Sequence, residues 1–88
     1  MNVEFLAHFH KDLQKIKQQS VLNEIQTAIL NAEQADRLSS LKNLKKLKGY
    51  KNAYRLRVGN YRIGVFIEEN TIEFARIAHR KDIYNLFP

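Results

Sequence analysis

The sequence from residue 54 to residue 65 reads YRLRVGNYRIGV and decides most of the fold. Apolar and basic side chains alternate on both sides of Gly59-Asn60, which is the period of a half-buried β-strand. Glycine followed by asparagine at the centre predicts a two-residue loop with a type II′ turn. The segment is therefore expected to form a β-hairpin with one apolar face and one basic face.

A two-residue loop determines which residues face each other across this hairpin. The expected pairs are Val58 with Tyr61, Arg57 with Arg62, Leu56 with Ile63, and Arg55 with Gly64. Arg55, Arg57 and Arg62 then share one face, and the hairpin contains no acidic residue. Like charges directly opposite each other destabilise a strand pair by a few tenths to about 1 kcal/mol. A bound phosphate would offset this cost, since guanidinium groups bind phosphate through two parallel hydrogen bonds. Alternatively, the cations only protect exposed strands from pairing with other chains.

The flanking segments predict one α+β domain, residues 1–88. Residues 3–5 form a short strand, residues 6–16 and 21–32 have helical spacing, and residues 71–78 form a further strand. Residues 35–51 place leucines at every third position, which favours a short helix or a wrapped loop with the leucines docked in the core. The predicted order is β-α-α-β-β-β. Two antiparallel N-terminal helices pack on one face of a small, mainly antiparallel, twisted sheet, and a short C-terminal segment follows.

A second tight turn at Glu69-Asn70 would extend the basic face onto the last strand. The register would then pair Phe66 with Glu73, Gly64 with Ala75, and Arg62 with Ile77. This register brings His79 onto the arginine face, with Arg80 near its rim. The small residues Gly64 and Ala75 would form the floor of a concave site that a ligand backbone can approach closely.

Positive charge is concentrated in the middle of the chain. Nine cations and no anion lie in this block: Arg37, Lys42, Lys45, Lys46, Lys48, Lys51, Arg55, Arg57 and Arg62. The rest of the chain carries more acidic than basic residues, so the whole net charge of +6 arises from the block. A block of one sign indicates a polyanionic partner, namely RNA, DNA, an acidic protein or an anionic lipid surface.

Composition and missing motifs exclude several classes of function. The chain has no cysteine, which excludes disulfides, thiolate metal sites and thiol catalysis. No apolar stretch reaches the ~18 residues of a membrane span, and the N-terminus lacks the pattern of a signal peptide. A cytoplasmic location without membrane contact is expected. His8 and His10 have no metal-ligand partners, and there is no glycine-rich phosphate loop or carboxylate pair, so no metal or other cofactor is expected.

Three segments together are typical of one family. They are LKKLKG at 44–49, YRLRVGNYR at 54–62 and HRKDIY at 79–84. In this combination the whole chain resembles the RelE/ParE superfamily of bacterial toxins. The His-Arg-x-x-x-Tyr ending is more similar to the RelE branch than to the gyrase-poisoning ParE branch.

The resemblance implies the toxin of a type II toxin-antitoxin system, neutralised by a cognate antitoxin and bound to operator DNA only through that complex. RelE-like members are ribosome-dependent endoribonucleases that cut mRNA without a metal, by attack of the 2′-hydroxyl on the neighbouring phosphate. Two alternatives stay open. One is a ParE-like, non-catalytic inhibitor of DNA gyrase, and the other is an inactive toxin that binds only its antitoxin.

The resemblance also implies roles for individual positions. The expected catalytic residues are Arg57, Arg62, His79, Arg80 and Tyr84. The block of positive charge, rather than the resemblance, makes the lysines candidates for sequence-independent contacts with phosphates. With Arg55 from the basic strand, the expected RNA-binding residues are Lys42, Lys45, Lys46, Lys48, Lys51 and Arg55. Some members of the family have lysine at the positions of Arg55 and Arg57, but arginine does not give up its proton in proteins. The general base is therefore expected to be His79 or Tyr84.

Overall fold

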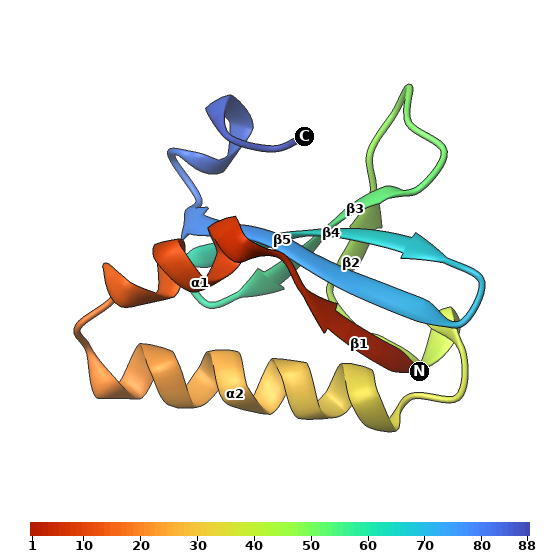
Figure 1. The fold of residues 1–88 in the computed structure, drawn as a ribbon, viewed down its shortest axis with the longest axis horizontal. Coiled ribbons are helices and arrows are strands. Elements are labelled where there is room, and N and C mark those ends of the chain that lie inside the picture. Colours follow the sequence, from red (N-terminus) through yellow and green to blue (C-terminus); the bar gives the residue numbers. More distant parts are fainter.

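The computed structural model describes residues 1–88 and contains two α-helices and a five-stranded sheet (Figure 1). The helical elements are α1 (Ala7–Gln14), α2 (Gln19–Gln34) and the short 3₁₀ turns η1 (Leu38–Ser40) and η2 (Ile83–Asn85). The strands are β1 (Asn2–Phe5), β2 (Leu44–Lys46), β3 (Ala53–Val58), β4 (Tyr61–Glu68) and β5 (Thr71–His79). The α+β class, with two helices before a mainly antiparallel sheet, is confirmed.

The sheet has the strand order β1-β5-β4-β3-β2, with β1 parallel to β5 and all other neighbours antiparallel. The edge strand β2 is an addition to the predicted order. It forms because Leu44 and Leu47 pack on opposite sides of the sheet, Leu44 against the main core and Leu47 in a second cluster. The expected short helix or wrapped loop would place all the leucines on one side, so it could not bring Leu44 and Leu47 into two clusters on opposite faces of the sheet.

Both predicted hairpins have the predicted two-residue loops. All four predicted pairs between β3 and β4 are present, and Gly59 has the positive φ of 58° that the turn requires. The second loop is also two residues long, since Glu68 pairs with Thr71, and Glu69 adopts a φ of 52°.

A β-bulge interrupts the pairing of β4 with β5 at Gly64 and Val65. Val65 pairs with Phe74, but Gly64 pairs with Arg76, so Ala75 is an extra residue on β5. Because side chains alternate along a strand, one extra residue reverses the face on which every later side chain lies.

The bulge makes the second half of the predicted register wrong. Arg62 pairs with Ala78 instead of Ile77, and Ile77 enters the main core. His79 pairs with Tyr61, whose side chain packs against that core. His79 therefore lies on the helix-covered face and not on the arginine face.

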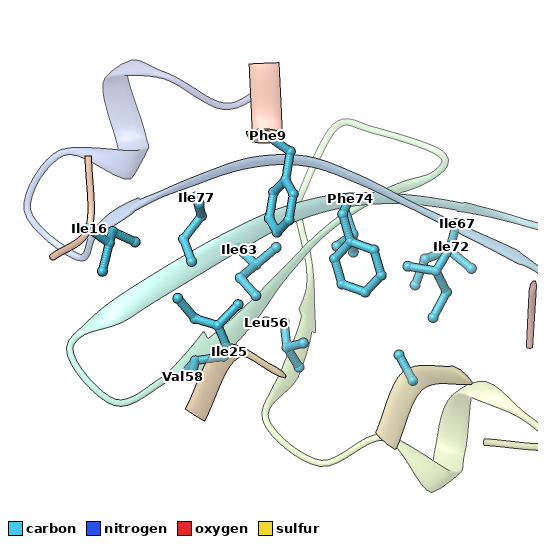
Figure 2. Packing of buried hydrophobic residues seen from close by; sticks show 12 residues of the cluster. Phe9, Ile16, Ile25, Leu56, Val58, Ile63, Ile67, Ile72, Phe74 and Ile77 are labelled. Carbon is cyan, nitrogen blue, oxygen red and sulfur yellow. The ribbon is translucent and has the colours of Figure 1, made fainter. Parts of the chain in front are cut away.

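The main core lies between the helices and one face of the sheet (Figure 2). Phe9 of α1 and Ile25 of α2 are buried against it, at 0% and 2% exposure. Phe5 stacks on Phe9 and on Phe74, Phe9 is tilted against Phe74, and the ring centroids lie 5.3 to 5.9 Å apart. A second, smaller cluster covers part of the opposite face and consists of Leu47, Ala53, Ala75, Ile83 and Phe87.

Asp12 joins α1 to the part of β5 that β1 does not reach. Its carboxylate accepts hydrogen bonds from Arg76 Nε at 2.8 Å, from Arg76 Nη2 at 3.2 Å and from the backbone N–H of Ile77 at 3.0 Å. Burial alone would raise the pKa of Asp12, but these hydrogen bonds and the charges of Arg76 and His8 outweigh burial, and the pKa lies below its ordinary value of 3.8. The same pairing raises the pKa of Arg76.

We expect Asp12→Asn to lower the free energy of unfolding at pH 7 by about 3 kcal/mol, because it leaves a largely buried guanidinium without its counterion. The Arg76 side chain keeps 17% exposure, which places the effect at the low end for such pairs. Since the folded pKa of Asp12 is lowered, the stabilisation is complete near neutral pH and disappears as the pH falls through that value. Denaturant titrations from pH 7 downward should show a difference between wild type and variant that is largest near pH 7 and shrinks as the pH falls below 3.8. Asp82→Asn, at an exposed position, is the control, and a loss of stability in Asp12→Asn that stays the same throughout the acid range would contradict the linkage.

Candidate nucleic-acid interface

The arginine face of the hairpin carries a cleft of about 480 Å³. It is lined by Asn43, Leu44, Lys45, Arg55, Arg57, Arg62 and Tyr84. Strand register explains the grouping, since Lys45 of β2 pairs with Arg55 of β3, and Arg57 of β3 pairs with Arg62 of β4. Three neighbouring strands thus place four cations on one face, and η2 adds a phenol.

Neutral acceptors hold two of the guanidinium groups. Arg57 Nη2 donates to Asn43 Oδ1 at 3.1 Å. Arg62 Nη1 donates to the backbone carbonyls of Gly59 and Tyr61, both at 2.9 Å. These contacts orient the guanidinium groups without neutralising their charge.

The third guanidinium contacts an aromatic ring. Arg55 Cζ lies 4.3 Å from the centroid of the Tyr84 ring, within range of a cation–π interaction. Arg55 Nε is buried and has no hydrogen-bond partner, so this donor remains unsatisfied. Tyr84 is 70% exposed, so its hydroxyl remains accessible from solvent.

No carboxylate compensates the charge of the cleft. The one salt bridge in the protein joins Asp12 to Arg76 at the β5 edge. The cleft therefore presents an uncompensated positive field, which favours an anionic ligand. The cations that produce it are Lys45, Arg55, Arg57 and Arg62.

The expected open floor at Gly64 and Ala75 is wrong. Ala75 is buried in the second hydrophobic cluster, together with Ile83 and Phe87 of the C-terminal segment. The Phe87 ring occupies the space above Gly64, where an added Cβ would overlap it. Figure 1 shows this segment on the side of the sheet opposite α2. The cleft lies beside the segment, and Tyr84 forms part of its wall.

His79 and Arg80 do not line the cleft. His79 lies edge-on to Tyr61, with ring centroids 5.8 Å apart, in a separate hollow that also contains Asp12 and Arg76. Arg80 is exposed in the turn after β5, and its N–H donates to the Asn60 carbonyl at 2.8 Å. The expectation that His79 and Tyr84 share one site is therefore wrong, and the bulge at Ala75 is the cause.

The lysines form a wider border around the cleft. Lys45 lines it, and Lys42 lines a neighbouring cleft of about 430 Å³ that shares Asn43 and Arg57. The remaining lysines of the block are exposed on β2 and on the loop between β2 and β3: Lys46, Lys48 and Lys51. In Figure 1 this loop rises on the same side of the sheet as the C-terminal segment.

Sequence reasoning missed Asn43. Its φ of 66° is in the left-handed region, which asparagine tolerates better than most residues. Its backbone carbonyl accepts from the Arg57 N–H at 3.0 Å, while its side chain binds the Arg57 guanidinium. An asparagine just before a lysine-rich edge strand was the available signal, but only the pairing of β2 with β3 connects it to Arg57.

Two further observations concern other classes of site. No three His, Cys, Asp or Glu side chains lie close enough together to hold a metal ion. Neither α-helix has the length and apolar character needed to span a membrane.

Comparison with known proteins agrees with this fold. The family described as "ParE toxin of type II toxin-antitoxin system, parDE" matches residues 3–84. Toxin RelE3 of Methanocaldococcus jannaschii is 44% identical over 89 residues, and the match covers all of both chains. A crystal structure of a RelB-RelE antitoxin-toxin complex from Methanococcus jannaschii matches with a TM-score of 0.79 and 42% identity, over 97% of this chain and 99% of that chain.

The YoeB dimer of Staphylococcus aureus shares the fold alone, with a TM-score of 0.72 at 17% identity over 91% of this chain and 97% of that chain. The family match over residues 3–84 and the 44% identity to Toxin RelE3 define the class of protein, a small toxin. The chain belongs to the RelE/ParE family of toxins and is the toxin of a type II toxin-antitoxin system.

Proposed function

We propose that this toxin is a ribosome-dependent endoribonuclease that cuts mRNA in the cleft formed by Arg55, Arg57, Arg62 and Tyr84. The observation that carries the proposal is the set of cations held by neutral groups on one face, with no carboxylate among them. Such a site suits a polyanion whose charge increases during the reaction. The resemblance to RelE-like toxins supports the same chemistry.

The proposed reaction on the ribosome uses no metal ion or other cofactor, since the RNA itself supplies both the attacking and the leaving oxygen. The RNA 2′-oxygen forms a bond to the adjacent phosphorus, and the bond from phosphorus to the 5′-oxygen breaks, which leaves a cyclic phosphate. One proton leaves the 2′-hydroxyl and one proton reaches the departing 5′-oxygen. Negative charge develops on the nonbridging oxygens, where Arg57 and Arg62 would stabilise it through charged hydrogen bonds.

Tyr84 is the candidate for proton transfer in the cleft. It is the one cleft residue with a hydroxyl group, which can donate or accept a proton. His79 belongs to the opposite face, so we do not assign it this role in the free toxin. Arg55 would hold the Tyr84 ring and add to the positive field.

The expected partners are the ribosome with its mRNA and a cognate antitoxin. A homologue 42% identical to this chain was crystallised with RelB, which supports a protein antitoxin for this toxin as well. If the antitoxin covers the cationic surface with an acidic segment, it would neutralise the positive field that attracts RNA.

The experiment that tests the function is primer extension on a translated message after expression of the toxin. Cleavage at defined positions of translated mRNA, absent from an untranslated copy of the same message, is the expected result. The match to the ParE description favours the second candidate, a gyrase inhibitor. DNA breaks and an SOS response with intact mRNA would support that candidate and reject the ribonuclease.

The border lysines should contribute sequence-independent contacts with phosphates. We expect replacement of Lys45, Lys46 and Lys48 by glutamine to make the plot of log affinity against log salt concentration shallower by about 2–3 units, since each lost phosphate contact removes ~0.7–0.9 from the slope. The loss of ribosome affinity should therefore be greatest at low salt. Lys11, Lys15 and Lys17 replaced together form a control of equal charge change outside the block. An unchanged slope in the first variant would remove these lysines from the interface.

A further inference from the structure

The C-terminal segment is held on the sheet by two apolar side chains. Residues 83–88 make no backbone hydrogen bond to the sheet: Asn85 donates to Asp82, and Leu86 and Phe87 donate to Ile83. Ile83 and Phe87, by contrast, are 0% and 4% exposed. Position and orientation of this segment therefore depend on how those two side chains pack.

Tyr84 lies between these anchors and cannot fix its own position. It is 70% exposed, it makes no side-chain hydrogen bond, and the Arg55 guanidinium lies over its ring at 4.3 Å. The position of an exposed side chain with one weak contact is determined mainly by the position of its own backbone. That backbone is fixed by Ile83 on one side and by Phe87 three residues later.

Because Gly64 has no side chain, the Phe87 ring can pack directly on the backbone of β4 at this position. A Cβ at position 64 would overlap the Phe87 ring, and the ring also packs against Phe66 with centroids 5.0 Å apart. Gly64 has no left-handed φ, so the requirement for glycine here is space and not backbone conformation. Gly64 pairs with Arg55 on the neighbouring strand, so the packing site of Phe87 is next to the residue whose guanidinium contacts Tyr84.

We propose that Phe87 is a positioning residue, which by sitting over Gly64 holds Tyr84 against Arg55 at the wall of the cleft. Phe87 does not line the cleft, so it would act on the reaction only through Tyr84. The importance of Tyr84 for cleavage rests on the proposed ribonuclease function, but the contact between Tyr84 and Arg55 can be measured without any activity.

The first test is structural and uses the ring-current shift that Tyr84 imposes on the Arg55 side-chain protons. Tyr84→Ala defines the shift without the ring. We expect Phe87→Ala and Gly64→Ala to move the Arg55 resonances most of the way to that reference, and Phe87→Leu to retain part of the wild-type shift. Leu86→Ala is the matched control, because Leu86 is 39% exposed and lies outside the second cluster. Wild-type Arg55 shifts in both Phe87→Ala and Gly64→Ala would overturn the proposal.

The second test is cleavage of mRNA on programmed ribosomes. We expect Phe87→Ala and Gly64→Ala to lower the maximal cleavage rate at least ~10-fold with KM changed less than ~2-fold, since the cations that bind RNA stay in place. If Phe87→Ala does not fold, Gly64→Ala and Phe87→Leu decide the question in the same way. Lost Arg55 shifts with an unchanged cleavage rate would overturn the positioning role. A wild-type toxin that cuts no RNA, while the Arg55 shifts respond as expected, would reject the ribonuclease and leave Phe87 as the anchor of Tyr84.

Discussion

Tyr84→Phe is expected to reduce the single-turnover rate of mRNA cleavage by ~10²–10⁴-fold, the usual contribution of a positioned proton donor or acceptor. The substitution removes one oxygen and keeps the ring that Arg55 contacts, so the cleft should keep its shape and charge. RNA affinity should therefore change little. Rapid mixing of toxin with programmed ribosomes measures the rate, and binding assays measure the affinity.

Tyr50→Phe is the matched control for this prediction. Tyr50 is 50% exposed and does not line the cleft, so its hydroxyl should contribute nothing to cleavage. Circular dichroism and thermal unfolding should be indistinguishable among wild type and both variants. Full activity of Tyr84→Phe would show that proton transfer belongs to another group, and His79, brought closer by rearrangement on the ribosome, would be the next candidate.

Arg57→Gln is expected to lower the cleavage rate by ~10²–10³-fold, the typical loss when one preorganised donor to a developing negative charge is removed. The same substitution should leave the folded state as stable as before, or raise its stability by up to about 1 kcal/mol, because it removes the repulsion from Arg62 directly opposite. Loss of activity together with unchanged or improved stability is the signature of a charge kept for function.

Lys17→Gln controls for the change in net charge, since Lys17 is exposed between the two helices and far along the chain from the block. Arg57→Lys separates charge from geometry, because lysine keeps the charge but lacks the planar pair of donors, and it should give an intermediate rate. A destabilised Arg57→Gln would indicate that the bond to Asn43 outweighs the repulsion, and that Arg57 is chiefly structural.

Prediction from the sequence was most accurate where two constraints acted within a few residues. In the hairpin of β3 and β4, the alternation of side chains and the two-residue loop at Gly59-Asn60 both specify the same register. All four predicted pairs are present, and with them the grouping of Arg55, Arg57 and Arg62 on one face. This grouping supplies three of the seven residues that line the candidate site.

Prediction was inaccurate where a distant contact overrides the local pattern. The apolar positions of β5 run Ile72, Phe74 and Ile77, and the spacing of three between the last two marks the bulge at Ala75. The bulge stabilises the fold in two ways, because it places Ile77 in the core and lets the Ile77 N–H donate a hydrogen bond to Asp12 on α1. The apolar spacing is compatible with a bulge, but the hydrogen bond to Asp12, 65 positions earlier in the chain, cannot be read from neighbouring residues.

The amino-acid order alone determined that this protein has a basic, exposed face on an antiparallel hairpin, because strand periodicity and turn chemistry operate between neighbours. Only the folded chain decided which other groups join that face. A single extra residue on β5 turned His79 away, and the packing of Phe87 over Gly64 brought Tyr84 in. Both outcomes arise from the way close-packed side chains far apart in sequence share space, and that condition exists only once the sheet, helices and C-terminal segment have come together.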